Sequence, residues 1–110
     1  PLFTSLLSMA DNIDKVKSMM NAISMSENLA DDVEWTSAMG QSATGKEAVK
    51  AMVDGMSAKW KEGKPNFKDW VAKDANTVTF LIETGQGFNV SVECVMTADG
   101  KISKWVSTKC

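Results

Sequence analysis

The sequence contains no histidine, no tyrosine and no arginine, so all twelve of its basic side chains are lysines. Without histidine the chain lacks the commonest general base, the Ser-His and Cys-His nucleophile pairs and the usual ligand of zinc. Without arginine it lacks the planar group that holds a carboxylate or phosphate through two hydrogen bonds. Without tyrosine it has no phenol to stabilise an oxyanion. Proton-transfer chemistry would therefore have to come from Asp, Glu, Lys or Cys.

Long apolar runs and an excess of positive charge are also missing. The longest apolar runs are short, such as Phe80-Leu81-Ile82, whereas a membrane span needs about 20 apolar residues. Twelve basic residues against fourteen acidic ones give a net charge of −2, which argues against a general nucleic-acid binder. We expect a soluble protein that binds neither nucleic acid nor membrane, with the cytoplasm favoured over secretion.

Cysteines and phosphate-binding glycines are few. Cys94 and Cys110 are the only cysteines, so a disulfide scaffold is excluded. Two free thiols are the simpler interpretation, and a single bridge between them is the alternative. Gly85-Gln86-Gly87 lies between two predicted strands and does not fit a phosphate-binding loop. Asp31-Asp32 is typical of a solvated acidic pair, so we expect no cofactor and no metal.

Two helices are predicted from apolar spacing. The first carries apolar residues at alternating spacings of four and three: Leu2, Leu6, Met9, Ile13, Val16, Met20 and Ile23. A helix packed on its own domain is favoured over a coiled-coil seam. Ser8 is a candidate cap for a start at Met9, which would leave residues 1–8 as an arm. In the second helix Thr44 and Glu47 fit a capping box. Gly63, in the left-handed position after the last turn, and Pro65 end it.

Alternating residues predict the strands. A short strand covers 33–37, and a loop follows at 40–43. Four more strands are predicted at 66–73, 77–84, 88–96 and 101–109. The connections between them are too short for helical crossovers, which indicates an antiparallel meander. Residues 1–110 therefore form one α+β domain, with the helices packed on one face of a curved antiparallel sheet.

Three motifs resemble those of the nuclear transport factor 2-like superfamily, and most closely its SnoaL-like domains. Leu29-Ala30-Asp31-Asp32-Val33-Glu34-Trp35 is similar to that family's exit from a helix into its first strand. Thr44-Gly45-Lys46-Glu47-Ala48-Val49 is similar to the start of its long helix, and Thr97-Ala98-Asp99-Gly100-Lys101-Ile102 to its last hairpin. The resemblance covers about residues 10–110.

The resemblance implies a cone-shaped sheet wrapped around a long helix, an apolar pocket at its open end, and a homodimer through the outer face of the sheet. Family members include cyclases, isomerases, dehydratases, epoxide hydrolases and non-catalytic carriers. This chain departs from the isomerase pattern, because Trp35-Thr36-Ser37 stands where those enzymes carry an Asp base. The missing His, Tyr and Arg remove the other known catalytic sets, so no catalytic residue is carried over from the family.

The candidate ligand-binding residues are the large or soft side chains on the predicted apolar faces: Trp35, Met39, Met52, Met56, Trp60, Phe67, Phe80, Phe88, Cys94 and Trp105. Each has core packing as its simpler role. Asp69 shares a face with Phe67 and Val71, and an inward-facing Asp69 would be a candidate general base in an apolar setting.

We expect a small-molecule-binding SnoaL-like domain with an apolar pocket, in which a cyclase or isomerase reaction would use a carboxylate base. Whether the domain is an enzyme stays open. The alternative is a non-catalytic dimerisation or partner-binding module of the same fold.

Overall fold

The computed structural model describes the backbone of residues 2–22 and 24–110 and the side chains of residues 12–22 and 24–110. Within these residues it has two helices, α1 (Leu2–Ala22) and α2 (Lys46–Gly63), with a 3-10 turn at Met25–Glu27. Its strands are β1 (Leu29–Thr36), β2 (Ser42–Thr44), β3 (Asn66–Ala72), β4 (Thr77–Glu83), β5 (Asn89–Met96) and β6 (Ile102–Lys109). The described residues include no helix long and apolar enough to cross a membrane.

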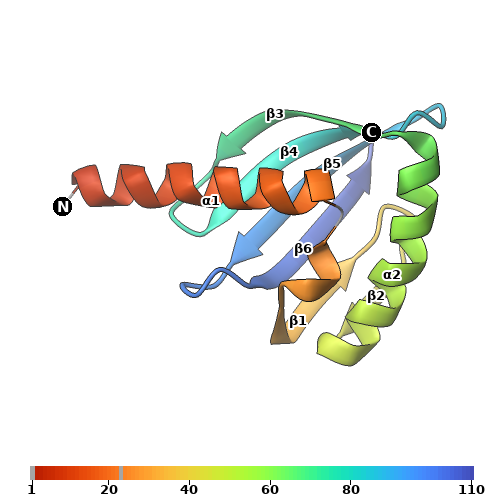
Figure 1. Ribbon diagram of the computed structural model, residues 1–110, viewed down its shortest axis with the longest axis horizontal. Coiled ribbons are helices and arrows are strands. Elements are labelled where there is room, and N and C mark those ends of the chain that lie inside the picture. The colour runs from red at the N-terminus through yellow and green to blue at the C-terminus, as the bar shows by residue number, and fades with distance from the viewer. Residues whose placement is uncertain (1, 23) are drawn as a thin grey trace.

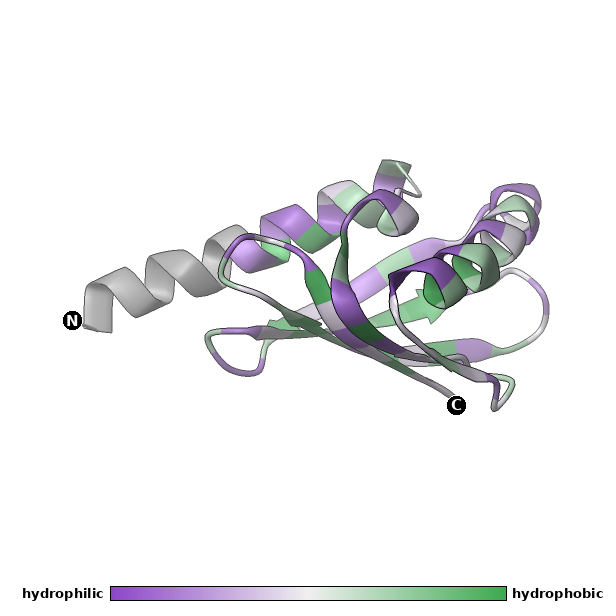
Figure 2. Ribbon diagram, turned by 90° about the horizontal axis from the view of Figure 1, so that it is seen from below, coloured by the Kyte–Doolittle hydropathy of each residue, from purple (hydrophilic) through white to green (hydrophobic). Residues whose placement is uncertain are grey.

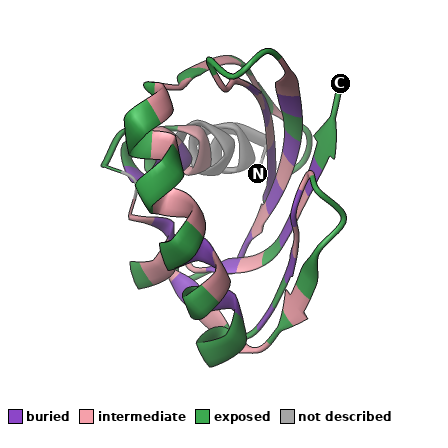
Figure 3. Cartoon of the chain, turned by 90° about the vertical axis from the view of Figure 1, so that its right-hand side faces the viewer, coloured by how far each residue is buried: buried purple, intermediate pink, exposed green. Residues whose placement is uncertain are grey.

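The strands form one six-stranded sheet in the order β2-β1-β6-β5-β4-β3 (Figure 1). Neighbouring strands are antiparallel, as predicted, except that β1 runs parallel to β6. Both helices lie on the same side of the sheet (Figure 2). α1 packs on β3 and β4, whereas α2 packs on β1 and β2. The predicted α+β architecture with a curved sheet is confirmed, and the sheet bends around α2 with its buried residues facing that helix (Figure 3).

A layer of aromatic rings forms the centre of the core. Trp35 of β1 pairs directly with Trp105 of β6, and their rings stack with centroids 4.3 Å apart and planes 2° apart. Phe80 of β4 meets Trp105 edge-on at 5.8 Å, and Trp70 of β3 stacks on Phe80 at 4.4 Å. The rings therefore extend across the sheet from β1 to β3, and the fully buried ones contribute most to the stability of the fold.

The early part of the chain differs from the prediction in three places. α1 begins at Leu2 and not at Met9, and Ile23, the last residue of the predicted stripe, lies outside the described residues. The first strand begins at Leu29 and not at residue 33, because Leu29 pairs with Ile102 of β6. Residues 42 and 43, predicted as loop, form β2 together with Thr44 and pair with β1.

The capping box predicted at Thr44 is also wrong. Thr44 pairs with Glu34 as the last residue of β2, so its backbone belongs to the sheet and the helix starts one residue later. Gly45 takes the capping position with φ 95° and provides no side-chain hydrogen bond. The Gly45 carbonyl accepts the first helical hydrogen bond from the Val49 amide at 3.0 Å.

The end of α2 is set by a close approach to the hairpin between β4 and β5. Gly63 is the last helical residue, and Lys64, not Gly63, takes the left-handed conformation at φ 50°. A Cβ at position 63 would lie 2.8 Å from the carbonyl oxygen of Thr84. Glycine is therefore needed at 63 for space and not for its backbone freedom.

Candidate functional site

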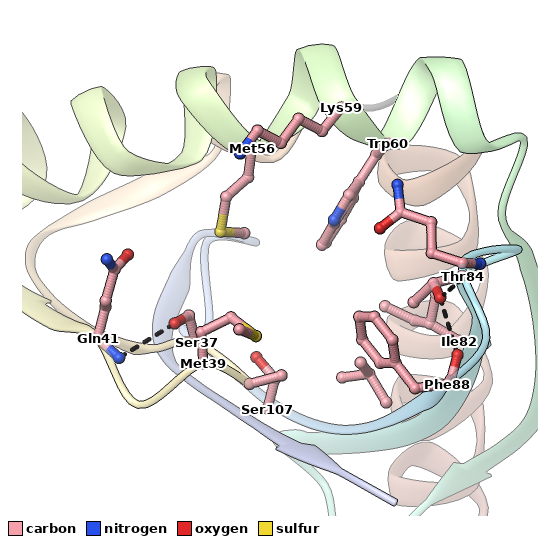
Figure 4. A pocket seen from close by; sticks show the side chains of 13 residues that line it. Ser37, Met39, Gln41, Met56, Lys59, Trp60, Ile82, Thr84, Phe88 and Ser107 are labelled. Atoms are coloured by element: carbon pink, nitrogen blue, oxygen red, sulfur yellow. Dashed lines mark hydrogen bonds between the residues drawn. The ribbon is translucent and has the colours of Figure 1, made fainter.

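A cavity of about 460 Å³ lies between the second half of α2, the turn after β1, and the ends of β4, β5 and β6 (Figure 4). Its volume is within the usual range for small-molecule sites. The apolar part of the lining consists of Ala38, Met39, Met56, Trp60, Ile82, Phe88 and Val90. The polar part consists of Ser37, Gln41, Lys59, Thr84, Gln86 and Ser107.

The apolar walls come from elements that are far apart in the sequence. Trp60 and Met56 project from α2, and Phe88 faces them from the end of the turn just before β5 (Figure 4). Met39 sits on the turn after β1 with 72% of its surface exposed, which places a flexible thioether at the rim. These side chains form a largely apolar enclosure that is open to solvent beside Met39.

The hydroxyl groups of the lining are partly engaged. Ser107 Oγ accepts a hydrogen bond from Trp105 Nε1 at 2.9 Å and donates one to the Thr36 carbonyl at 2.9 Å. Thr84 Oγ1 donates to the Phe88 carbonyl at 2.8 Å. Ser37 Oγ accepts from the Gln41 amide at 3.2 Å, which leaves its hydroxyl proton for another acceptor.

Lys59 is the one charged side chain in the lining, and no Asp or Glu among the described residues lines the cavity. Glu83, which lies between the lining residues Ile82 and Thr84 in the sequence, is paired with other side chains at the sheet surface. Its Oε1 accepts from Asn66 at 2.8 Å and its Oε2 lies 3.2 Å from Lys68 Nζ. The Asn66 amide and the Lys68 charge lower the pKa of Glu83. The cavity therefore has positive character without a carboxylate base.

Four of the ten predicted ligand-binding residues line the cavity: Met39, Met56, Trp60 and Phe88. Four others are enclosed in the core at 0–3% exposure: Trp35, Phe80, Cys94 and Trp105. Met52 and Phe67 are half-buried against the core, and Phe67 borders a separate hollow near the ends of the helices. The structure thus separates a packed aromatic core from the accessible cavity, a division that alternation alone does not make.

Asp69 does not meet the condition on which its predicted role depended. Lys68 pairs with Leu81 and Val71 pairs with Thr79, so β3 carries one extra residue here. Asp69 occupies this bulge at φ 58° and is exposed. The bulge shifts the alternation, so that Trp70 turns inward in place of Asp69. A desolvated general base at Asp69 is therefore excluded by the geometry of the strand.

Both cysteines are free, with Cys94 buried and Cys110 exposed, so the alternative of a bridge between them is wrong. Burial raises the pKa of the Cys94 thiol to about 12, and a thiol that stays protonated at neutral pH is a poor nucleophile. Asp31 and Asp32 are exposed. Among the described side chains, no three Cys, Asp or Glu residues gather in a way that would hold a metal ion.

Sequence reasoning missed the polar half of the lining. Ser37 and Ser107 each follow a core tryptophan by two residues, which is one step along the same strand face. Continuing the inward alternation past Trp35 and Trp105 would have found both serines. Lys59 had no such signal, because an exposed lysine next to Trp60 on a helix is an ordinary surface residue.

No protein-family model matches the sequence, and no curated protein matches it. Solved structures match in fold. A steroid delta-isomerase from Pseudomonas aeruginosa has a TM-score of 0.74 at 13% identity, over 94% of this chain and 80% of that one. A SnoaL-like protein of unknown function from Burkholderia thailandensis has a TM-score of 0.67 at 16% identity, over 94% and 95% of the two chains.

An NTF2-like protein of unknown function from Exiguobacterium sp. 255-15 has a TM-score of 0.61 at 18% identity, over 96% of this chain and 98% of that one. At such identities the similarity shows the fold alone. It confirms the fold that the sequence resemblance predicted, and the activity has to be argued from the cavity.

Proposed function

We propose, on the premise that the chain has the nuclear transport factor 2-like fold in its SnoaL-like form, that it binds an apolar small molecule in the cavity beside α2. The observation that carries the proposal is the composition of the lining. Seven apolar residues, with Trp60 and Phe88 as the large aromatic ones, enclose about 460 Å³ together with six polar residues. That combination is typical of small-molecule sites, in which apolar walls supply affinity and polar groups set orientation.

Carboxylate catalysis has little support in this cavity. A steroid delta-isomerase shares the fold, and a cyclase or isomerase reaction was one form of the predicted function. A base of that kind must reach the proton it removes, yet no described Asp or Glu lines the cavity. We therefore favour binding without carboxylate base catalysis.

Binding of N-phenyl-1-naphthylamine, a neutral dye that fluoresces in apolar surroundings, tests the proposal. We expect saturable binding that Phe88→Ala weakens about tenfold, because about 1.4 kcal/mol is a modest part of what a buried aromatic contact contributes. Phe67→Ala is the matched control, since Phe67 is also half-buried but lies outside the cavity. Equal losses in the two variants, or no saturable binding by the wild type, would remove the proposal.

A homodimer is the second candidate function, and the outer face of the sheet favours it. Alternation places Leu81, Val95 and Val106 on this face, where they are half-buried. Val71 of the edge strand is 54% exposed on the same face. These apolar residues alternate with polar ones such as Thr79 and Glu93, and a second copy would cover them. Native mass spectrometry measures the outcome: the mass of two chains supports the dimer, and the mass of one chain at micromolar concentration refutes it.

A further inference from the structure

The cavity carries an uncompensated positive charge. Among the residues that the structure describes, Lys59 is the one ionisable side chain that lines the cavity. The ion pairs of the described chain join Lys68 to Glu83 and Lys73 to Glu93, so neither of them involves Lys59. An ammonium group beside an apolar cavity without a carboxylate partner attracts an anion and repels a cation.

Several of the remaining polar groups of the lining can donate a hydrogen bond to a ligand, although Ser107 and Thr84 already donate theirs to carbonyls. Ser37 already accepts a hydrogen bond through Oγ, so its hydroxyl is left to donate. The ring of Trp60 projects into the cavity (Figure 4) and brings an indole N–H, which donates and cannot accept. Gln41 and Gln86 add amide groups at the rim. The donors therefore suit a ligand that presents oxygen acceptors.

A second lysine adds positive charge beside the cavity wall. Lys109 Nζ lies 4.8 Å from the centre of the Phe88 ring, and Phe88 is part of the cavity wall. Glu83, the last residue of β4, accepts a hydrogen bond from Asn66 and forms an ion pair with Lys68 on the sheet surface. Two lysines, Lys59 and Lys109, thus lie at the cavity or against its wall, although the chain as a whole carries a net charge of −2.

On the basis of the binding function proposed above, we infer that the ligand is an apolar monoanion. It is a ring system or chain with one carboxylate or similar oxyanion, whose charged end lies beside Lys59 at the mouth of the cavity. Its apolar body lies between Trp60 and Phe88. A neutral analogue of the same shape fills the same walls but leaves the lysine without a partner, and a cationic analogue meets repulsion.

Three compounds with one ring system separate shape from charge: 2-naphthoate, methyl 2-naphthoate and 2-naphthylmethylammonium. Each is measured by displacement of N-phenyl-1-naphthylamine near pH 7.5. We expect 2-naphthoate to bind about fivefold more tightly than its methyl ester, the size of effect that a partly exposed ion pair produces. The ammonium compound should bind most weakly. Higher salt should reduce the preference, because the lysine is exposed and screened.

The variant Lys59→Gln should lose the preference for the carboxylate and keep the affinity for the ester. Lys50→Gln is the matched control, since Lys50 lies on the same helix, is exposed and does not line the cavity. Equal affinity of the wild type for acid and ester overturns the inference, as does a preference that survives in Lys59→Gln. In both cases dye binding still supports the apolar site. Absence of binding by the dye and all three compounds removes the binding function and this inference together.

Discussion

Alanine at two glycines of α2 should have opposite effects on stability. Gly55 lies in mid-helix, and a Cβ built there meets nothing within 4 Å. Gly63 ends the same helix, where a Cβ would lie 2.8 Å from the carbonyl oxygen of Thr84. The same atom is added in both variants, so the difference between them isolates the contact of the helix end with the hairpin.

The magnitudes follow from two effects of opposite sign. Alanine is a better helix former than glycine by roughly 0.5–1 kcal/mol, and Gly55→Ala should gain about that much. In Gly63→Ala the new methyl group presses on a backbone oxygen that cannot rotate away, and such overpacking typically costs about 1–3 kcal/mol. We therefore expect the two variants to differ by about 2 kcal/mol, which corresponds to about 8 °C in melting temperature for a chain of this size.

Urea unfolding followed by tryptophan fluorescence measures this difference, with equal m-values as the sign that the two-state comparison is valid. Dye binding provides a second readout, because Thr84 and Gln86 belong to the turn of this hairpin and also line the cavity. A displaced turn would therefore change the shape of the cavity. Gly63→Ala should weaken binding of N-phenyl-1-naphthylamine, whereas Gly55→Ala should leave it unchanged. If both variants are stabilised to the same degree, the close approach of α2 to the hairpin is wrong.

Three further predictions concern buried and paired groups. Ellman's reagent at pH 8 should label Cys110 in the native protein and Cys94 only after unfolding, because burial raises the pKa of the Cys94 thiol to about 12; rapid labelling of both would contradict the burial. Trp35→Phe should destabilise less than Trp105→Phe by about 1 kcal/mol in urea unfolding, since Trp35 Nε1 is buried without a hydrogen-bond partner among the described residues, whereas Trp105 Nε1 donates to Ser107 Oγ. The Asn66 amide and the Lys68 charge lower the pKa of Glu83 from its ordinary value of 4.5. The ionised carboxylate should therefore stabilise the fold above pH 4.5, and this stabilisation should be lost as the pH falls below that value. Unfolding in acid should therefore depend less on pH in Glu83→Gln, and an unchanged dependence would count against that pairing.

Local sequence patterns predicted the strands that pair with their neighbours along the chain. Residues 77–84 and 88–96 alternate cleanly because β4 and β5 form a hairpin with one face on the core. The pattern fails where pairing is distant. Leu29 belongs to β1 because it pairs with Ile102. Thr44 does not cap α2, as the sequence predicted, because it pairs with Glu34 in the sheet.

The site was less predictable than the fold, because alternation shows which residues face inward but not which of them pack in the core and which line the cavity. Large inward residues were the natural candidates, yet Trp35 and Trp105 stack on each other and close the centre of the sheet. The bulge in β3 turned Asp69 outward and removed the base that alternation had offered. A single extra residue in a strand is invisible to a two-residue period until the partner strand is known.

The parallel pairing of β1 and β6 explains why the cavity begins where the aromatic core ends. Trp35 lies opposite Trp105, and one residue on Thr36 lies opposite Val106. The next inward positions along the two strands are therefore Ser37 and Ser107, both of which line the cavity. The change from tryptophan to serine occurs on both strands at the same level, so the stacked rings stay in the core and do not line the cavity, whereas the serines one step further along do. Replacing Ser107 by a larger apolar residue would therefore extend the core into the site.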